Sequence, residues 1–158
     1  MKRAIIYYSL TNNTERTAKG LASKLNADLY KIETVKAYPR KKSSQMFYCG
    51  MQATFNLKPA IKPLDLKAGD YDEIILGTPI WAGKNVPPVN TLLKNSEICD
   101  KITSVFTFSG GGDNEKCMEA LKSKLPNLKS QVAFGDENGP CSADNQEKLE
   151  KYLENFTK

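Results

Sequence analysis

The chain has 158 residues, 40% of them hydrophobic and 26% charged, a composition typical of one globular domain over residues 1–158. Its formal charge of +5 is modest, and no apolar run is long enough for a membrane span or a signal peptide. We therefore expect a cytoplasmic protein without a membrane partner. The chain contains no histidine, which excludes catalysis by a Ser-His-Asp triad or a Cys-His pair.

Cysteines and basic residues narrow the range of partners further. The four cysteines are widely spaced and form no C-x-x-C pair, which favours reduced thiols over a metal site. The densest basic cluster consists of Lys36 and residues 40–42, with only Tyr38 near it and no recognised nucleic-acid motif around it. We expect neither a bound metal nor a nucleic-acid partner.

Short runs of β-branched and aromatic residues alternate with amphipathic stretches along the chain. The runs predict five strands, at 3–8, 29–35, 72–77, 103–108 and 131–134. Helical faces follow at 18–25, 89–96, 117–125 and 149–156, and the long connection 36–71 is expected to hold a further helix. Strict alternation with nearly all-apolar strands predicts a parallel sheet covered by helices on both faces, a three-layer α/β/α fold.

The loop after the first strand reads S9-L-T-N-N-T14 and leads directly into a helix. Free backbone N–H groups and the positive end of the helix dipole favour an anion there, and hydroxyl and amide side chains can donate further hydrogen bonds. The loop lacks the lysine of a nucleotide-hydrolysing P-loop, so we expect it to hold a terminal phosphate without cleaving it. Ordinary N-capping is the alternative, but one cap explains only one polar residue.

Two later loops, each following a strand, could reach the same edge of the sheet. G77-T-P-I-W-A-G-K84 contains the only tryptophan and suits a loop that presents a flat ring, although a lone tryptophan is often part of a core. S109-G-G-G-D113 would let the backbone approach a ligand closely, although a flexible turn is an alternative. It lacks the G-x-G-x-x-G spacing of a dinucleotide fingerprint.

In this order, the three loops resemble those of the flavodoxin family. The resemblance implies a five-stranded parallel sheet of order 2-1-3-4-5 with FMN at the switch point between strands one and three. Ser9, Thr11, Asn12, Asn13 and Thr14 would then bind the phosphate. Thr78, Pro79, Ile80, Trp81 and Ala82 would lie beside the ribityl chain and the isoalloxazine, and Ser109, Gly110, Gly111, Gly112 and Asp113 would face the polar edge of the ring.

The chain also departs from the electron carriers that it resembles, because those are usually acidic and often carry a second aromatic residue after strand four. Two functions remain open: electron transfer through bound FMN to a redox partner protein, or NAD(P)H-dependent reduction of a quinone or similar small molecule. The absence of a second nucleotide fingerprint favours the carrier, and the glycine-only third loop favours the enzyme. We expect a monomer or weak homodimer.

A phosphoacceptor signalling domain of the same architecture is excluded. It would need acidic residues at the ends of the first and third strands, where the chain reads YYS and GTP.

Overall fold

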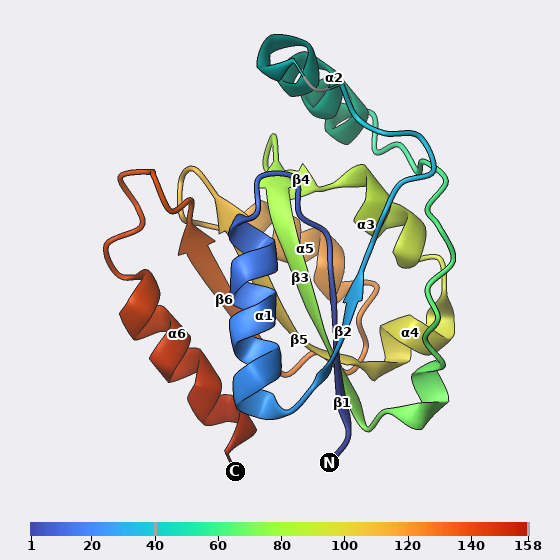
Figure 1. Ribbon diagram of the computed structural model, residues 1–158, viewed down its shortest axis with the longest axis vertical. Helices are drawn as coiled ribbons and strands as arrows, with labels where there is room; N and C mark the ends of the chain where they lie inside the picture. Colours follow the sequence, from blue (N-terminus) through green and yellow to red (C-terminus); the bar gives the residue numbers. More distant parts are fainter. Residues whose placement is uncertain (40, 158) are drawn as a thin grey trace.

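The computed structural model describes residues 1–39 and 41–157, apart from the side chains of residues 42 and 46. Arg40 and the Lys42 side chain, which belong to the basic cluster noted in the sequence, lie outside this description. The fold is built on a parallel sheet of strand order β2-β1-β3-β5-β6, which confirms the order expected from the sequence (Figure 1). These strands span Asp28–Lys31, Arg3–Tyr7, Glu73–Trp81, Ile102–Ser109 and Ser130–Gly135 respectively.

Helices cover both faces of the sheet because successive strand residues point to opposite sides. On one face, Ile5 and Tyr7 pack with α1 (Asn13–Leu25) and α6 (Asn145–Leu153). On the other, Ala4 and Ile6 belong to the core beneath the remaining helices of the sheet. Those helices are α3 (Pro87–Leu92), α4 (Ser96–Lys101) and α5 (Glu115–Lys122), and short 3-10 turns lie at Ala68–Asp70 and Glu154–Phe156.

Strand lengths differ from the sequence prediction in ways that strand pairing explains. β2 ends at Lys31 because its neighbour β1 ends opposite it at Tyr7, so residues beyond have no parallel partner. β3 instead continues past Gly77 through the expected loop, because β5 pairs with it as far as Pro79 and a short strand β4 (Lys84–Asn85) then turns back against it. The helix expected around residues 89–96 is two short helices, α3 and α4.

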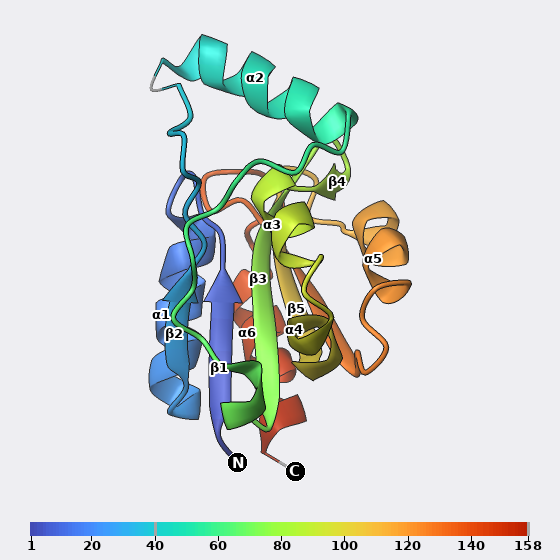
Figure 2. The ribbon, with the colours of Figure 1, turned by 90° about the vertical axis from the view of Figure 1, so that its right-hand side faces the viewer.

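One helix stands apart from the three layers. α2 (Lys42–Thr54) lies beyond the carboxyl ends of the strands, across the top of the molecule in both ribbon views (Figures 1 and 2). Long irregular arms connect it to β2 and β3, as the sequence predicted for this connection. Its position places a helix over the edge of the sheet where the three candidate loops converge.

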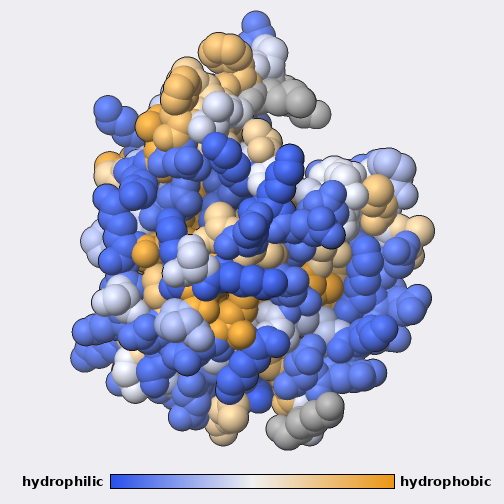
Figure 3. Space-filling view, turned by 180° about the vertical axis from the view of Figure 1, so that it is seen from behind, coloured by the Kyte–Doolittle hydropathy of each residue, from blue (hydrophilic) through white to orange (hydrophobic). Residues whose placement is uncertain are grey.

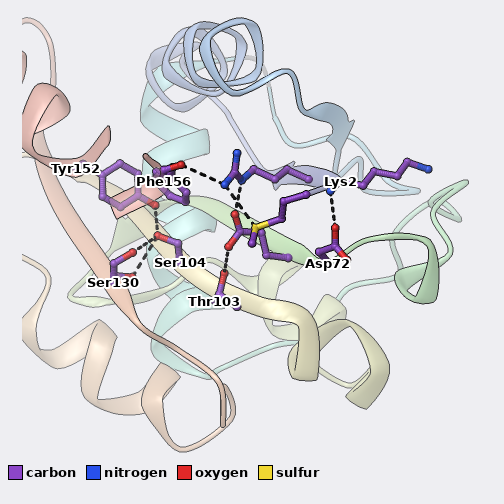
Figure 4. Close-up of polar contacts among 10 residues, drawn as sticks. Lys2, Asp72, Thr103, Ser104, Ser130, Tyr152 and Phe156 are labelled. Atoms are coloured by element: carbon purple, nitrogen blue, oxygen red, sulfur yellow. Dashed lines mark hydrogen bonds and ion pairs between the residues drawn. The ribbon is translucent and has the colours of Figure 1, made fainter. Parts of the chain in front are cut away.

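Polar residues at the opposite end of the sheet form a structural network (Figure 4). The hydroxyl of Ser104 is hydrogen-bonded to those of Ser130 and Tyr152, and Arg3 forms an ion pair with Glu73. Burial raises the pKa of Tyr152, so its hydroxyl stays protonated at neutral pH. These contacts satisfy polar groups at the amino ends of the strands, far from the candidate loops.

Candidate functional site

The first loop leads into the N-terminus of α1 at the carboxyl end of the sheet. Asn12 precedes α1 with a left-handed backbone (φ 71°) and its side chain caps nothing. The N–H of Glu15 donates to Ser9 Oγ at 3.3 Å, and the N–H groups of Asn13 and Thr14 have no intrahelical acceptor because both residues lie in the first turn of α1. Together with the positive end of the α1 dipole, these two groups form an anion site made of backbone.

The side chains of this loop divide into structural and available groups. Asn13 donates from Nδ2 to Asp136 Oδ1 at 3.4 Å and accepts from Arg16 at 3.3 Å, which ties the loop to the segment after β6. Thr14 is buried, whereas Thr11 and Asn12 are exposed. Ser9 and Asn13 therefore form hydrogen bonds within the protein, whereas the side chains of Thr11 and Asn12 are exposed and can contact a ligand.

The second loop is a β-hairpin rather than an irregular segment. Thr78, Pro79, Ile80 and Trp81 are strand residues, and the chain reverses at Ala82 and Gly83, which both have positive φ, 50° and 72°. Two successive positive φ values are the signature of a type I′ hairpin turn, which Gly83 accommodates freely. Thr78 is fully buried, whereas Ile80 and Trp81, farther along the strand, line the same cavity as Leu10 and Thr11 of the first loop.

Trp81 belongs to an aromatic cluster with Tyr8, Tyr38 and Tyr48. Its ring packs edge-on against Tyr8 at 5.9 Å and against Tyr38 at 5.7 Å between centroids, and Tyr38 contacts Tyr48 in the same manner. Burial, more than the neighbouring groups, raises the pKa of Tyr8 and of Tyr38, so both remain neutral. Sequence reasoning missed these tyrosines because they come from three separate segments that only the tertiary fold brings to Trp81.

A cavity of about 510 Å³ lies between the first loop, the hairpin and α2. This volume falls within the range of small-molecule sites, and the walls are mainly apolar with a few polar groups. Its lining residues are Leu10, Thr11, Gln45, Cys49, Gly50, Ile80, Trp81 and Ala82. We call it the hairpin cavity. It brings together four of the expected site residues, namely Thr11, Ile80, Trp81 and Ala82, and adds a wall from α2 that sequence reasoning missed.

Cys49 is the one thiol in the wall of the hairpin cavity. It is buried, and burial raises its pKa to about 11. At neutral pH the sulfur therefore carries its proton and acts as an apolar wall atom rather than as a nucleophile. Among the described residues, no group of three His, Cys, Asp or Glu side chains could hold a metal ion.

The third loop lies beside the hairpin cavity rather than in its wall. Ser109 ends β5 and its Oγ donates to the Asp113 carbonyl at 3.0 Å, while Gly110 and Gly111 are exposed. Gly112 has φ 68°, and a Cβ on it would lie 2.8 Å from Cys141 Cβ, so packing requires glycine there. Asp113 lines a separate cavity of about 310 Å³, which shares Ile80 with the hairpin cavity.

Asn114 is a residue of this smaller cavity that the sequence did not single out. Its side chain is only 9% exposed, and in the described part of the chain its Nδ2 is the one buried side-chain nitrogen or oxygen without a hydrogen-bond partner. An amide donor left unpaired in a buried position costs free energy that a ligand acceptor would recover. Only the tertiary structure reveals this, because asparagine before a helix reads as an ordinary cap.

A family model described as flavodoxin matches residues 2–155. The chain belongs to the flavodoxin family. No curated protein is significantly similar to it in sequence. Within the described residues of this flavodoxin-family chain, no helix is both long and apolar enough to cross a membrane.

Solved structures share the fold over nearly their whole length. A Bacteroides eggerthii protein provisionally classed as a flavoprotein is 25% identical with a TM-score of 0.71, covering 99% of this chain and 98% of its own. A protein of the same provisional class from Bacteroides uniformis is 21% identical with a TM-score of 0.74, covering 97% of each chain. A Lactobacillus acidophilus flavoprotein, solved in complex with FMN, is 22% identical with a TM-score of 0.67, covering 93% of this chain and 97% of that one.

Proposed function

We propose that this flavodoxin-family protein binds one FMN and transfers electrons through it. The observation that carries the proposal is the pairing of the α1 N-terminus, where the Asn13 and Thr14 N–H groups have no intrahelical acceptor, with an adjoining, mainly apolar cavity of about 510 Å³. A phosphate and a flat, largely apolar ring need these two surroundings, and the family and the FMN complex of the Lactobacillus acidophilus structure support the same ligand.

The residues present fit the parts of FMN by their chemistry. The N–H groups of Asn13 and Thr14, with the Thr11 hydroxyl and the Asn12 amide, would hold the phosphate. Ile80, Trp81 and Ala82 would border the ring, and the unpaired Asn114 amide supplies a donor for a ring acceptor. Bound FMN supplies one- and two-electron redox chemistry.

What the chain itself contributes is binding and a controlled environment. Ile80, Trp81 and Ala82 of the hairpin and Cys49 of α2 would give a bound ring a mainly apolar surrounding. Neutral tyrosines around Trp81 place no charge beside the ring, since burial keeps Tyr8 and Tyr38 protonated. Asp113 of the third loop and Glu115, the first residue of α5, are the carboxylates that line the smaller cavity.

Reconstitution with FMN and riboflavin tests the proposal. Because riboflavin lacks the phosphate, we expect it to bind at least about tenfold more weakly than FMN, in line with charge-assisted hydrogen bonds at the α1 N-terminus. Quenching of Trp81, the only tryptophan, reports binding directly. Equal affinities for the two flavins, or Trp81 fluorescence unchanged at saturation, would contradict the proposed site.

An NAD(P)H-dependent oxidoreductase acting on a quinone or similar acceptor is the second candidate. The exposed glycines of the third loop favour it, because Gly110 and Gly111 place no side chain over the neighbouring cavity. Anaerobic mixing of the FMN-loaded protein with NADH or NADPH distinguishes the two. Rapid loss of flavin absorbance supports the reductase, and unchanged absorbance supports a carrier that receives electrons from a partner protein.

A further inference from the structure

A second cavity of about 510 Å³ lies against the hairpin turn and is lined by four lysines. Lys58 follows α2, Lys84 belongs to β4, and Lys116 and Lys124 come from α5 and the residues after it. We call it the lysine cavity. Its other lining residues are neutral: Asn56, Ala82, Gly83, Asn85, Asn90 and Ala120. Four cations therefore reach one concave surface from separate segments of the chain.

No carboxylate balances these cations at the cavity. Glu115 and Glu119 lie on α5 but do not line the lysine cavity. Within the described parts of the chain, none of the four lysines forms an ion pair, although Lys84 donates to the Thr54 carbonyl at 3.0 Å. A concave surface lined by one sign of charge concentrates its field and raises the local concentration of anions.

The lysine cavity adjoins the proposed cofactor site. Ala82 lines both this cavity and the hairpin cavity, so only the hairpin turn lies between the two. Gly83 and Lys116 also line the smaller cavity that holds the unpaired Asn114 amide. Figure 3 views the side of the molecule that carries α5, where hydrophilic side chains dominate below the apolar α2.

We propose that the lysine cavity binds the phosphate groups of a nucleotide co-substrate, and that NADPH is the preferred member of this class. The inference rests on FMN binding and on the second candidate function, the NAD(P)H-dependent oxidoreductase. NADPH carries about four negative charges at neutral pH, from its pyrophosphate and its 2′-phosphate, whereas NADH carries about two. Four unpaired lysines match the larger charge, and the shared wall at Ala82 places such a ligand next to the cofactor site.

A small ligand explains this site better than an acidic protein partner. Lys58, Lys116 and Lys124 are exposed and Lys84 is half-buried, but all four line one concave cavity of about 510 Å³, which can receive phosphate groups, whereas a protein partner would contact a flatter patch. The amides of Asn56, Asn85 and Asn90 in the wall add neutral hydrogen-bonding groups suited to a ribose or a base.

Titration calorimetry of the FMN-loaded protein tests the inference with 2′,5′-ADP, NADPH and NADH as ligands. We expect NADPH and 2′,5′-ADP to bind more tightly than NADH. The double substitution Lys116→Gln with Lys124→Gln should weaken 2′,5′-ADP binding at least about tenfold, because it removes two charge-assisted contacts. The matched control is Lys122→Gln with Lys129→Gln, which removes the same charge from exposed lysines outside the cavity and should change binding less than about twofold.

Several outcomes overturn the inference without affecting the proposed function. Equal weakening in both double variants would mean that net charge alone attracts the nucleotide. Absence of nucleotide binding, or binding of a polyglutamate peptide in its place, would refute a nucleotide site. Quenching of Trp81 by FMN is measured first on the same samples, so a failure of FMN to bind is recognised as a failure of the proposed function itself.

Discussion

At the scale of single residues, the site depends on polar groups that the protein leaves unpaired. Asn12 turns the backbone into α1 without capping it, which keeps two helix N–H groups free. Asn114 provides a side-chain donor of the same kind, because its Nδ2 is buried without a hydrogen-bond partner in the described structure. A buried donor such as Asn114 Nδ2 carries a desolvation cost of about 1–3 kcal/mol unless a ligand satisfies it.

Asn114→Ala separates a ligand-binding role from a structural one. If the amide serves only the ligand, its removal should leave the free energy of unfolding of the apoprotein unchanged or slightly higher, because an unsatisfied donor is lost. FMN affinity should fall by about tenfold. Chemical denaturation of the apoprotein and FMN titration measure the two quantities. A large loss of apoprotein stability with unchanged FMN affinity would assign Asn114 a purely structural role.

At the scale of secondary-structure elements, α2 decides whether the hairpin cavity is closed. Its buried residue Gln52 accepts a hydrogen bond from the Tyr38 hydroxyl at 2.9 Å, which holds the helix over the aromatic cluster. Phe47, Met51 and Phe55 are exposed on its outer face, and the top of the molecule is correspondingly apolar (Figure 3). The inner face contributes Cys49 and Gly50 to the cavity wall.

Gly50→Leu tests α2 as a wall of the cofactor site. A Cβ on Gly50 meets nothing within 4 Å, so the larger side chain can occupy the cavity without displacing the protein. Leucine also favours the helix over glycine by roughly 0.8–1 kcal/mol, so apoprotein stability should rise or stay constant. FMN affinity should nevertheless fall by at least about tenfold, because the leucine would occupy space that the ligand needs.

The matched control for this substitution lies on α1. Gly20 is a helical glycine that is exposed, has open space around its Cβ position and lines none of the cavities described above. Gly20→Leu should therefore give the same gain in helix propensity with unchanged FMN affinity. Equal FMN affinity in both variants would place the cofactor away from α2.

At the scale of the whole molecule, the sheet could be predicted from the sequence and the walls of the site only in part. Apolar runs such as Ile74 to Leu76 fix a buried parallel strand by composition alone. The hairpin was missed because Pro79 and Gly83 read as loop residues, whereas pairing with β5 and β4 extends the strand. The α2 wall, the tyrosines around Trp81 and the unpaired Asn114 amide depend on tertiary contacts between distant segments, which local pattern does not encode.

The whole molecule also bears on the redox potential of the flavin through its charge and its third loop. Reduction adds negative charge to FMN, so a net charge of +5 opposes reduction less than an acidic protein does. Salt screens distant charges over about 8–10 Å, so the charges that line the neighbouring cavities matter most; these include Asp113 and Glu115 as well as Lys116. The exposed Gly110 and Gly111 leave the third loop without an aromatic ring that would favour the oxidised, neutral flavin by contact. We expect the two-electron reduction potential of the bound FMN to be less negative than that of an acidic flavodoxin under the same conditions.

Gly111→Tyr supplies the missing ring and isolates its effect. A Cβ at this position has only Asp113 Oδ2 nearby, at 3.8 Å, so a side chain fits without strain. A stacked ring worth about 0.5–1.5 kcal/mol to the oxidised flavin should lower the two-electron potential by about 10–30 mV. Gly111→Ser is the control, because it fills the same position without a ring and should leave the potential near that of the wild type. Potentiometric titration of the three FMN-loaded proteins beside an acidic flavodoxin makes the comparison. A tyrosine variant indistinguishable from the serine variant, or a wild type as negative as the acidic flavodoxin, would mean that Asp113 and Glu115 control the flavin instead.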